Sequence, residues 1–113
     1  MKPSITPEEL IRMQGLAERL FSHIHRVPKK RRDYFVNKIA PLIIGELPAQ
    51  FEFPPAAKQT RNAKLNELEG ALESLLWAAV WSISMYQNIQ GSSAVTFNMN
   101  ACETHLDKVD SLI

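Results

Sequence analysis

Five basic side chains fall within seven consecutive positions of the stretch HIHRVPKKRRDYF, which covers residues 23–35. They are Arg26, Lys29, Lys30, Arg31 and Arg32. Cations at this density attract a phosphate backbone and make binding sensitive to salt, although they do not read a base sequence. The stretch therefore favours electrostatic binding of RNA or DNA. The alternative is a solvated junction between two helices, in which some of the cations stabilise the C-terminus of the first helix.

Further basic residues lie on both sides of this cluster. Arg12, Arg19 and Arg26 are seven residues apart, so they line one side of a helix. Lys38 follows the cluster, and residues 12–38 hold eight basic residues against two acids. A second basic group comes before a later helical segment and consists of Lys58, Arg61 and Lys64. All of these cations except Lys58 are candidate binding residues for nucleic acid or a protein partner. Whether the two groups meet depends on the lengths of the connections and stays open.

The net charge of +1 conceals a division between the two parts of the chain. Residues 1–64 hold twelve Lys or Arg and six Asp or Glu, which gives +6. Residues 65–113 hold one Lys and six acids, which gives −5. Such an asymmetry indicates a charged partner, or two complementary faces of a protein that associates with itself.

Residues that could support catalysis or hold a metal ion form no recognised pattern. His23 and His25 are two apart and would point in different directions on a helix, and no Cys or His spacing matches a metal site. Cys102 has no evident partner base, and Glu69 with Glu73 is most simply a solvated pair on one helix face. A glycine-rich phosphate loop is also missing from the sequence. We therefore expect a non-catalytic protein that needs no metal and no cofactor.

The elements that must position the cations are amphipathic helices, because apolar residues recur at alternating spacings of three and four. Thr6, Pro7 and Glu9 form a typical helix start with a capping box, and Pro41 should kink or locally disturb the second helix. The expected helices cover residues 6–26, 29–48, 61–90 and 96–113. With 45% hydrophobic residues, the 113-residue chain is predicted to form one all-α domain, an antiparallel up-down four-helix bundle.

The third predicted helix carries apolar residues on two sides. Its main stripe runs from Leu65 to Tyr86, and Trp77 and Trp81 fall nearly opposite that stripe. Tryptophan is enriched at protein interfaces, so this second side predicts an oligomer or partner interface. Its expected members are Gly70, Ser74, Trp77, Trp81 and Met85, with the small residues permitting close helix approach. The alternative is that other helices, or the FEFPP segment, cover both tryptophans.

The sequence also bears on location. The N-terminal residues MKPSITPEEL contain no apolar signal-peptide core. The longest apolar run, LLWAAVW at residues 75–81, is far shorter than the roughly 20 residues that span a bilayer. The single cysteine excludes an internal disulfide and fits a reducing compartment. We therefore expect a soluble cytoplasmic protein without membrane contacts.

The order of these pieces resembles a known family. A first amphipathic helix ends in the hydrophobic-Pro-basic junction RVPKKRRDYFVNKI, a long helix contains LNELEGALESLLWAAV, and the last helix contains TFNMNACETHLDKVDSLI. Over roughly residues 10–113 this pattern is similar to the accessory variability determinant (Avd) proteins of diversity-generating retroelements. It also resembles the related four-helix-bundle proteins encoded in ribosomal RNA intervening sequences.

The resemblance implies a fold and a role. It implies a four-helix bundle assembled as a ring-like homopentamer, which binds a reverse transcriptase and nucleic acid and supports mutagenic copying of a template RNA. Under this hypothesis the cations of the junction and of the first helix would face RNA or the polymerase, and Trp77 and Trp81 would form subunit contacts. Avd proteins are typically strongly basic, whereas this chain is nearly neutral. The alternative is a homo-oligomeric structural or regulatory bundle of the intervening-sequence type without a polymerase partner.

Overall fold

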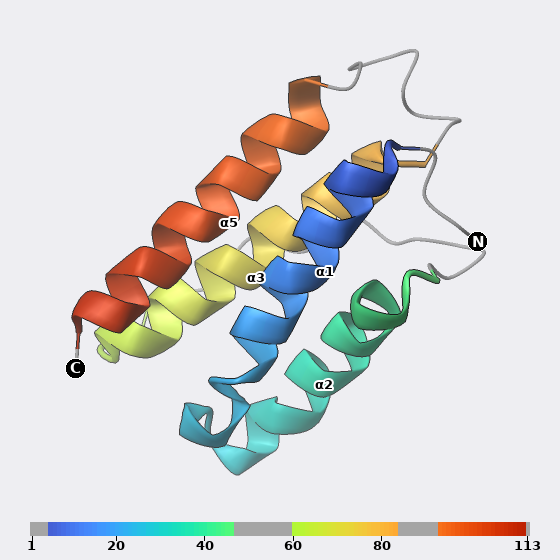
Figure 1. Cartoon of the computed structure of the whole chain (residues 1–113). Coiled ribbons are helices and arrows are strands. Elements are labelled where there is room, and N and C mark those ends of the chain that lie inside the picture. Colours follow the sequence, from blue (N-terminus) through green and yellow to red (C-terminus); the bar gives the residue numbers. More distant parts are fainter. Residues whose placement is uncertain (1–4, 47–59, 84–92, 113) are drawn as a thin grey trace.

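A computed structural model describes residues 5–46, 60–83 and 93–112, and every regular element in these ranges is a helix (Figure 1). The elements are α1 (Pro7–Phe21), the short 3₁₀ helix η1 (Ile24–Arg26), α2 (Lys29–Ile44), α3 (Ala63–Trp81) and α5 (Ser93–Ser111). The prediction of an all-helical domain is therefore confirmed for the described part of the chain. Among these helices, none combines the length and the apolar character needed to cross a bilayer.

The start of α1 follows the capping signal in the sequence. The Thr6 hydroxyl accepts a hydrogen bond from the Glu9 backbone N–H at 3.2 Å, and the Glu9 carboxylate reaches back to the Thr6 backbone N–H at 3.4 Å. The helix ends at Phe21 rather than at Arg26, and the Ser22 hydroxyl donates to the Arg19 carbonyl at 2.6 Å. The chain then passes through η1 into the Val27–Pro28 junction.

Pro41, which was predicted to kink or locally disturb the second helix, lies inside the last turn of α2. The helix ends at Ile44, before the predicted residue 48, because Gly45 adopts a left-handed conformation with φ of 74°. The Gly45 and Glu46 N–H groups donate to the carbonyls of Leu42 and Pro41, at 3.3 and 3.0 Å. This hydrogen-bonded turn closes the end of α2.

The third helix ends at Trp81 rather than near Gln90. The Ser82 backbone N–H donates to the Ala78 carbonyl, and the buried Ser82 hydroxyl donates to the Ala79 carbonyl at 2.6 Å. Serine side chains that bond to the backbone in this way compete with helix continuation. Residues 84–90 of the predicted helix lie outside the described residues. The last helix begins at Ser93, slightly before the predicted residue 96.

The helix directions differ from a strictly alternating up-down order. Arg12 and Arg19 of α1 contact Glu103 and Asp110 of α5, so residue numbers rise together and α1 runs parallel to α5. Figure 1 shows α2 and α3 running together in the opposite direction. The connection from residue 45 to residue 62 permits this arrangement. It is longer than the 16-residue α2, which spans about 24 Å, and can return the chain to the end where α2 began.

The hydrophobic core lies between the four described α-helices, and α3 is its central member. Nine side chains of α3 are buried, whereas α2 contributes only Phe35, Ile39 and Leu42. The predicted stripe of the last helix is confirmed, because Met99, Cys102, Leu106 and Val109 are all buried. Packing of these stripes is what stabilises helices that would be marginal alone.

Candidate nucleic-acid interface

The junction between η1 and α2 presents a group of exposed cations, which we call the basic end. Its members are Arg26, Lys29, Lys30 and Arg32. Within residues 5–46, 60–83 and 93–112, none of the four has a carboxylate partner within 4 Å. In the described part of the chain, the sequence-predicted cluster is thus a solvent-facing group of positive charges without ion-pair partners, apart from Arg31.

The local fold concentrates positive potential at this point. Val27, which is buried, anchors the junction, and Pro28 then occupies the N-cap of α2 without providing a side-chain cap. The first turn of α2 contains no acid, although acids would be favoured there by the positive end of the helix dipole. Cations at a helix N-terminus add to that potential, so the arrangement favours a bound anion such as phosphate.

Arg31 is directed inward and belongs to a different environment. Its guanidinium forms an ion pair with the carboxylate of Glu69 on α3, a side chain that is only 6% exposed. The same guanidinium lies 5.7 Å from the ring centroid of Tyr34. Arg31 lies four residues before the buried Phe35, so it shares the inner face of α2. We assign it to the attachment of α2 to α3.

The second basic group lies at the same end of the bundle as the basic end. Because α2 and α3 run in the same direction, Arg61 and Lys64 at the start of α3 are on the side where α2 begins (Figure 1). Asn62 caps α3 by accepting from the Leu65 backbone N–H at 3.0 Å. Arg61 is exposed and Lys64 is half-buried, while Lys58 lies outside the described residues.

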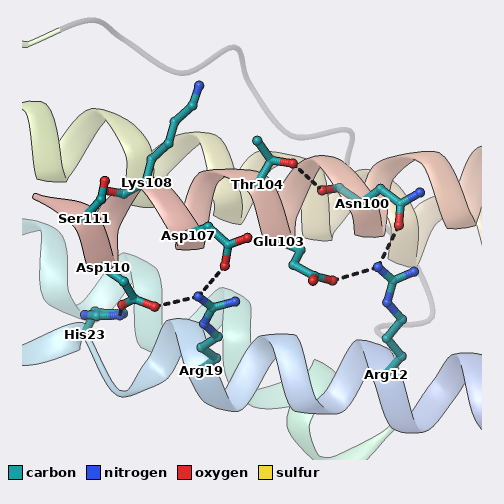
Figure 2. A network of polar contacts seen from close by, with 10 residues as sticks. All are labelled: Arg12, Arg19, His23, Asn100, Glu103, Thr104, Asp107, Lys108, Asp110 and Ser111. Atoms are coloured by element: carbon teal, nitrogen blue, oxygen red, sulfur yellow. Dashed lines mark hydrogen bonds and ion pairs between the residues drawn. The ribbon is translucent and has the colours of Figure 1, made fainter.

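Arg12 and Arg19 have carboxylate partners inside the chain (Figure 2). Arg12 donates to Asn100 Oδ1 at 2.7 Å and to Glu103 Oε2 at 2.9 Å. Arg19 donates to Asp107 at 2.8 Å and to Asp110 at 2.6 Å. These hydrogen bonds raise the pKa of Arg19, and the bond from Arg19 is the main cause that lowers the pKa of Asp110.

The spacing of the acids in the last helix is the sequence signal for these ion pairs, and it was not recognised. Glu103 and Asp110 are seven residues apart, as are Arg12 and Arg19, so two helices running in parallel bring the pairs into register. The role predicted for the two arginines in binding nucleic acid stays a prediction. Lys38, the remaining candidate cation, is half-buried and lies 5.9 Å from the Tyr34 ring centroid.

Four of the five residues predicted for an oligomer interface lie on α3: Gly70, Ser74, Trp77 and Trp81. The rings of Trp77 and Trp81 are stacked, with centroids 5.7 Å apart and an interplanar angle of 21°. Both are half-buried, and Trp81 also packs against the core. Ser74 is half-buried too, and Met85 lies outside the described residues.

Gly70 is packed against α5 of the same chain. A Cβ atom at this position would lie 2.7 Å from the ring of His105, which is itself held by Glu67 at 2.7 Å. The close helix approach that Gly70 was predicted to permit therefore occurs between α3 and α5.

Cys102 has the environment of a core residue. It is fully buried on α5, and burial raises the pKa of its thiol to about 12. The thiolate is the nucleophilic form, so at neutral pH this side chain is not activated for attack.

His23 gives the fold a pH dependence. Its ring is buried, with Nε2 3.5 Å from Asp110 Oδ1, and burial together with the charge of Arg26 lowers its pKa below the ordinary 6.5. Asp110 and Arg19 also face the ring, with opposite effects. The unfolded chain therefore takes up a proton at a higher pH than the folded protein. The stability that this difference provides is complete above pH 6.5 and is lost as pH falls below that value.

We accordingly expect the free energy of unfolding to fall between about pH 7.5 and pH 5.5, and to fall less in a His23→Gln variant. Urea denaturation of both proteins at both pH values measures this difference. An equal loss in wild type and variant would show that His23 does not carry the effect.

Comparisons of the chain with protein-family models, with curated proteins and with solved structures gave no match.

Proposed function

We propose that this chain is a non-catalytic helical protein that binds the phosphate backbone of single-stranded RNA through its basic end. The observation that carries the proposal is that some of the basic side chains form ion pairs with carboxylates and others do not. Arg12, Arg19 and Arg31 are engaged by carboxylates, whereas the basic end has no such partner among the described residues. Exposed cations without acids, placed at a helix N-terminus, are the electrostatic signature of a phosphate site.

The proposed biological role is that of an accessory subunit of a diversity-generating retroelement. The resemblance of the junction and of the last two helices to Avd proteins supports this role, including a reverse transcriptase as protein partner. Assembly as a homopentamer is part of the same proposal. A ring would repeat the basic end in each subunit and raise the local positive potential without any new contact.

The test replaces all four residues of the basic end with glutamine: Arg26→Gln, Lys29→Gln, Lys30→Gln and Arg32→Gln. Each lost phosphate contact weakens binding, and four together should lower the affinity for a labelled single-stranded RNA about a hundredfold at low salt. Fluorescence anisotropy at equilibrium measures this. Arg31 is left in place so that the anchor of α2 is kept.

A matched variant separates local from general charge effects. Replacing Arg12, Arg19, Lys38 and Lys108 with glutamine removes the same formal charge from other positions. We expect it to lower RNA affinity by no more than about fivefold, because only long-range potential is lost. Equal losses in the two variants would refute a binding site at the junction.

The second candidate function is that of a homo-oligomeric interaction protein with no polymerase partner. The stacked, half-buried pair Trp77 and Trp81 favours it, together with Phe97 nearby on α5, whose side chain is 71% exposed. Trp81 and Phe97 line the same surface hollow. Apolar surface of this kind marks interaction sites.

For this candidate we expect the double variant Trp77→Glu and Trp81→Glu to have a smaller particle mass than the wild type in light scattering. Buried carboxylates would make the subunit contact unfavourable. Far-ultraviolet circular dichroism confirms that the helices persist. A wild-type protein that is already monomeric, or a variant of unchanged mass, would exclude this interface.

A further inference from the structure

The seam between α1 and α5 is a row of ion pairs at the surface. It joins Arg12 and Arg19 of α1 to Glu103, Asp107 and Asp110 of α5 (Figure 2). All three pairs have N–O distances between 2.6 and 2.9 Å. The carboxylates therefore occupy the positions around each guanidinium that phosphate oxygens would take in a nucleic-acid complex.

The seam ends where α5 ends. Arg12 and Arg19 lie on α1, which ends at Phe21, and both pair with acids of α5. Arg26 lies beyond that end, in η1, and forms no ion pair with the described residues, although its charge contributes to the lowered pKa of Asp110. The last helical residue of α5 is Ser111, just after Asp110. Arg26, the third arginine, is left to join the exposed cations of the junction. The acids of α5 thus divide the basic residues into a covered group, Arg12 and Arg19, which form ion pairs with α5, and an open group, the basic end, which does not.

The covered arginines are still close to solvent. The side chains of Arg12 and Arg19 are 36% and 32% exposed, and the three acids are about half exposed or more. Exposed pairs of this kind are weak and are screened by salt. Each guanidinium could turn toward an external phosphate by rotation of its own side chain, while α5 remains packed through Met99, Cys102 and Leu106.

We propose that α5 is an intramolecular competitor of RNA: its carboxylates hold Arg12 and Arg19 and limit binding to the basic end. This inference rests on the proposed function, because it concerns the regulation of that same RNA contact. Neutralising the α5 acids extends the contact surface from the basic end to Arg19 and Arg12 of α1. The resulting site is larger, binds RNA more tightly and depends more strongly on salt.

The test neutralises the seam with Glu103→Gln, Asp107→Asn and Asp110→Asn in the full chain. We expect the affinity for a labelled single-stranded RNA at low salt to rise about tenfold. The slope of log affinity against log salt should steepen by about 1.4, corresponding to two added phosphate contacts. Thermal denaturation followed by circular dichroism checks that the variant is folded.

A matched control carries the same change in net charge. Glu8→Gln, Glu18→Gln and Glu46→Gln remove three exposed acids that form no ion pair with the described residues. This control should raise affinity by less than threefold and leave the slope nearly unchanged. Adding Arg12→Gln and Arg19→Gln to the seam variant should abolish its gain.

The same two arginine substitutions in the wild type provide the second test, which does not need the seam variant to fold. Since the acids of α5 already hold both arginines in the wild type, the two substitutions should change RNA affinity by less than about twofold. A loss of tenfold would overturn the proposal, as would a seam variant that gains no more than its control. Either result leaves the basic end as the RNA site. The proposed function itself is refuted only if the glutamine variant of the basic end binds RNA as tightly as the wild type.

Discussion

Replacing Arg31 with alanine is expected to lower the free energy of unfolding by about 3 kcal/mol, with only a minor effect on RNA binding by the folded protein. The reason is the carboxylate that remains. Glu69 is 6% exposed, and without Arg31 it is a buried charge with no cation to compensate it. This loss of stability lies at the lower end of the range for broken buried ion pairs, because the Arg31 side chain is itself 42% exposed.

Two further variants identify the cause of that loss. Arg31→Ala combined with Glu69→Gln should recover part of the stability, because no buried charge is left behind. Arg32→Ala, at the exposed neighbouring position, should change the free energy of unfolding by no more than about 0.5 kcal/mol. Urea denaturation measures all three. If Arg31→Ala and Arg32→Ala prove equally mild, Arg31 does not anchor α2.

Replacing Phe35 with alanine should cost about 4 kcal/mol in the free energy of unfolding. Its side chain is 1% exposed and is the largest fully buried one among the described residues, so the substitution leaves a cavity. The effect falls on α2 in particular, because this helix has only three fully buried residues, Phe35, Ile39 and Leu42. Since α2 carries Lys29, Lys30 and Arg32, its attachment determines whether the basic end keeps its shape.

The measurement for Phe35→Ala is urea denaturation together with hydrogen exchange of backbone amides. We expect protection to fall first in α2, while α3 and α5, which bury more residues, keep theirs longer. Ile44→Ala is the matched control, since this apolar residue of the same helix is 68% exposed and should cost less than about 0.5 kcal/mol. A cost below about 1.5 kcal/mol for Phe35→Ala would contradict the proposed attachment of α2.

Much of the fold could be predicted from local signals in the sequence. The capping box at Thr6 and Glu9 fixed the start of α1, and the regular stripe from Met99 to Val109 identified the buried face of α5. Both signals act within one or two helical turns. The end of α3 was placed too late because Ser82, a weak local competitor for backbone hydrogen bonds, lies inside a continuing apolar pattern.

Helix direction could not be derived in this way. The connection from residue 45 to residue 62 is long enough for either direction of α3, and only packing between distant segments selects one. The candidate site depends on this choice, because the parallel arrangement of α2 and α3 brings Arg61 and Lys64 to the end that carries Lys29 and Lys30.

Which basic residues form ion pairs with distant carboxylates could not be derived from the sequence either, because this too depends on packing between distant segments. Sequence spacing grouped Arg31 with Lys30 and Arg32, although its position four residues before Phe35 places it on the inner face of α2. The partners of Arg12 and Arg19 lie about 90 residues away on α5, so their identification needed the relative direction of the two helices. Long-range pairing of charges is set by tertiary structure and not by local propensity.

The central claim is that the four exposed cations at the start of α2 contact the RNA backbone. The salt dependence of the affinity of the wild-type protein for a labelled single-stranded RNA tests it most directly, because the slope counts released counterions. Four contacts predict that log affinity falls against log salt with a slope of about −2.8. A slope of about −1 or shallower, or no binding at low salt, would contradict the account.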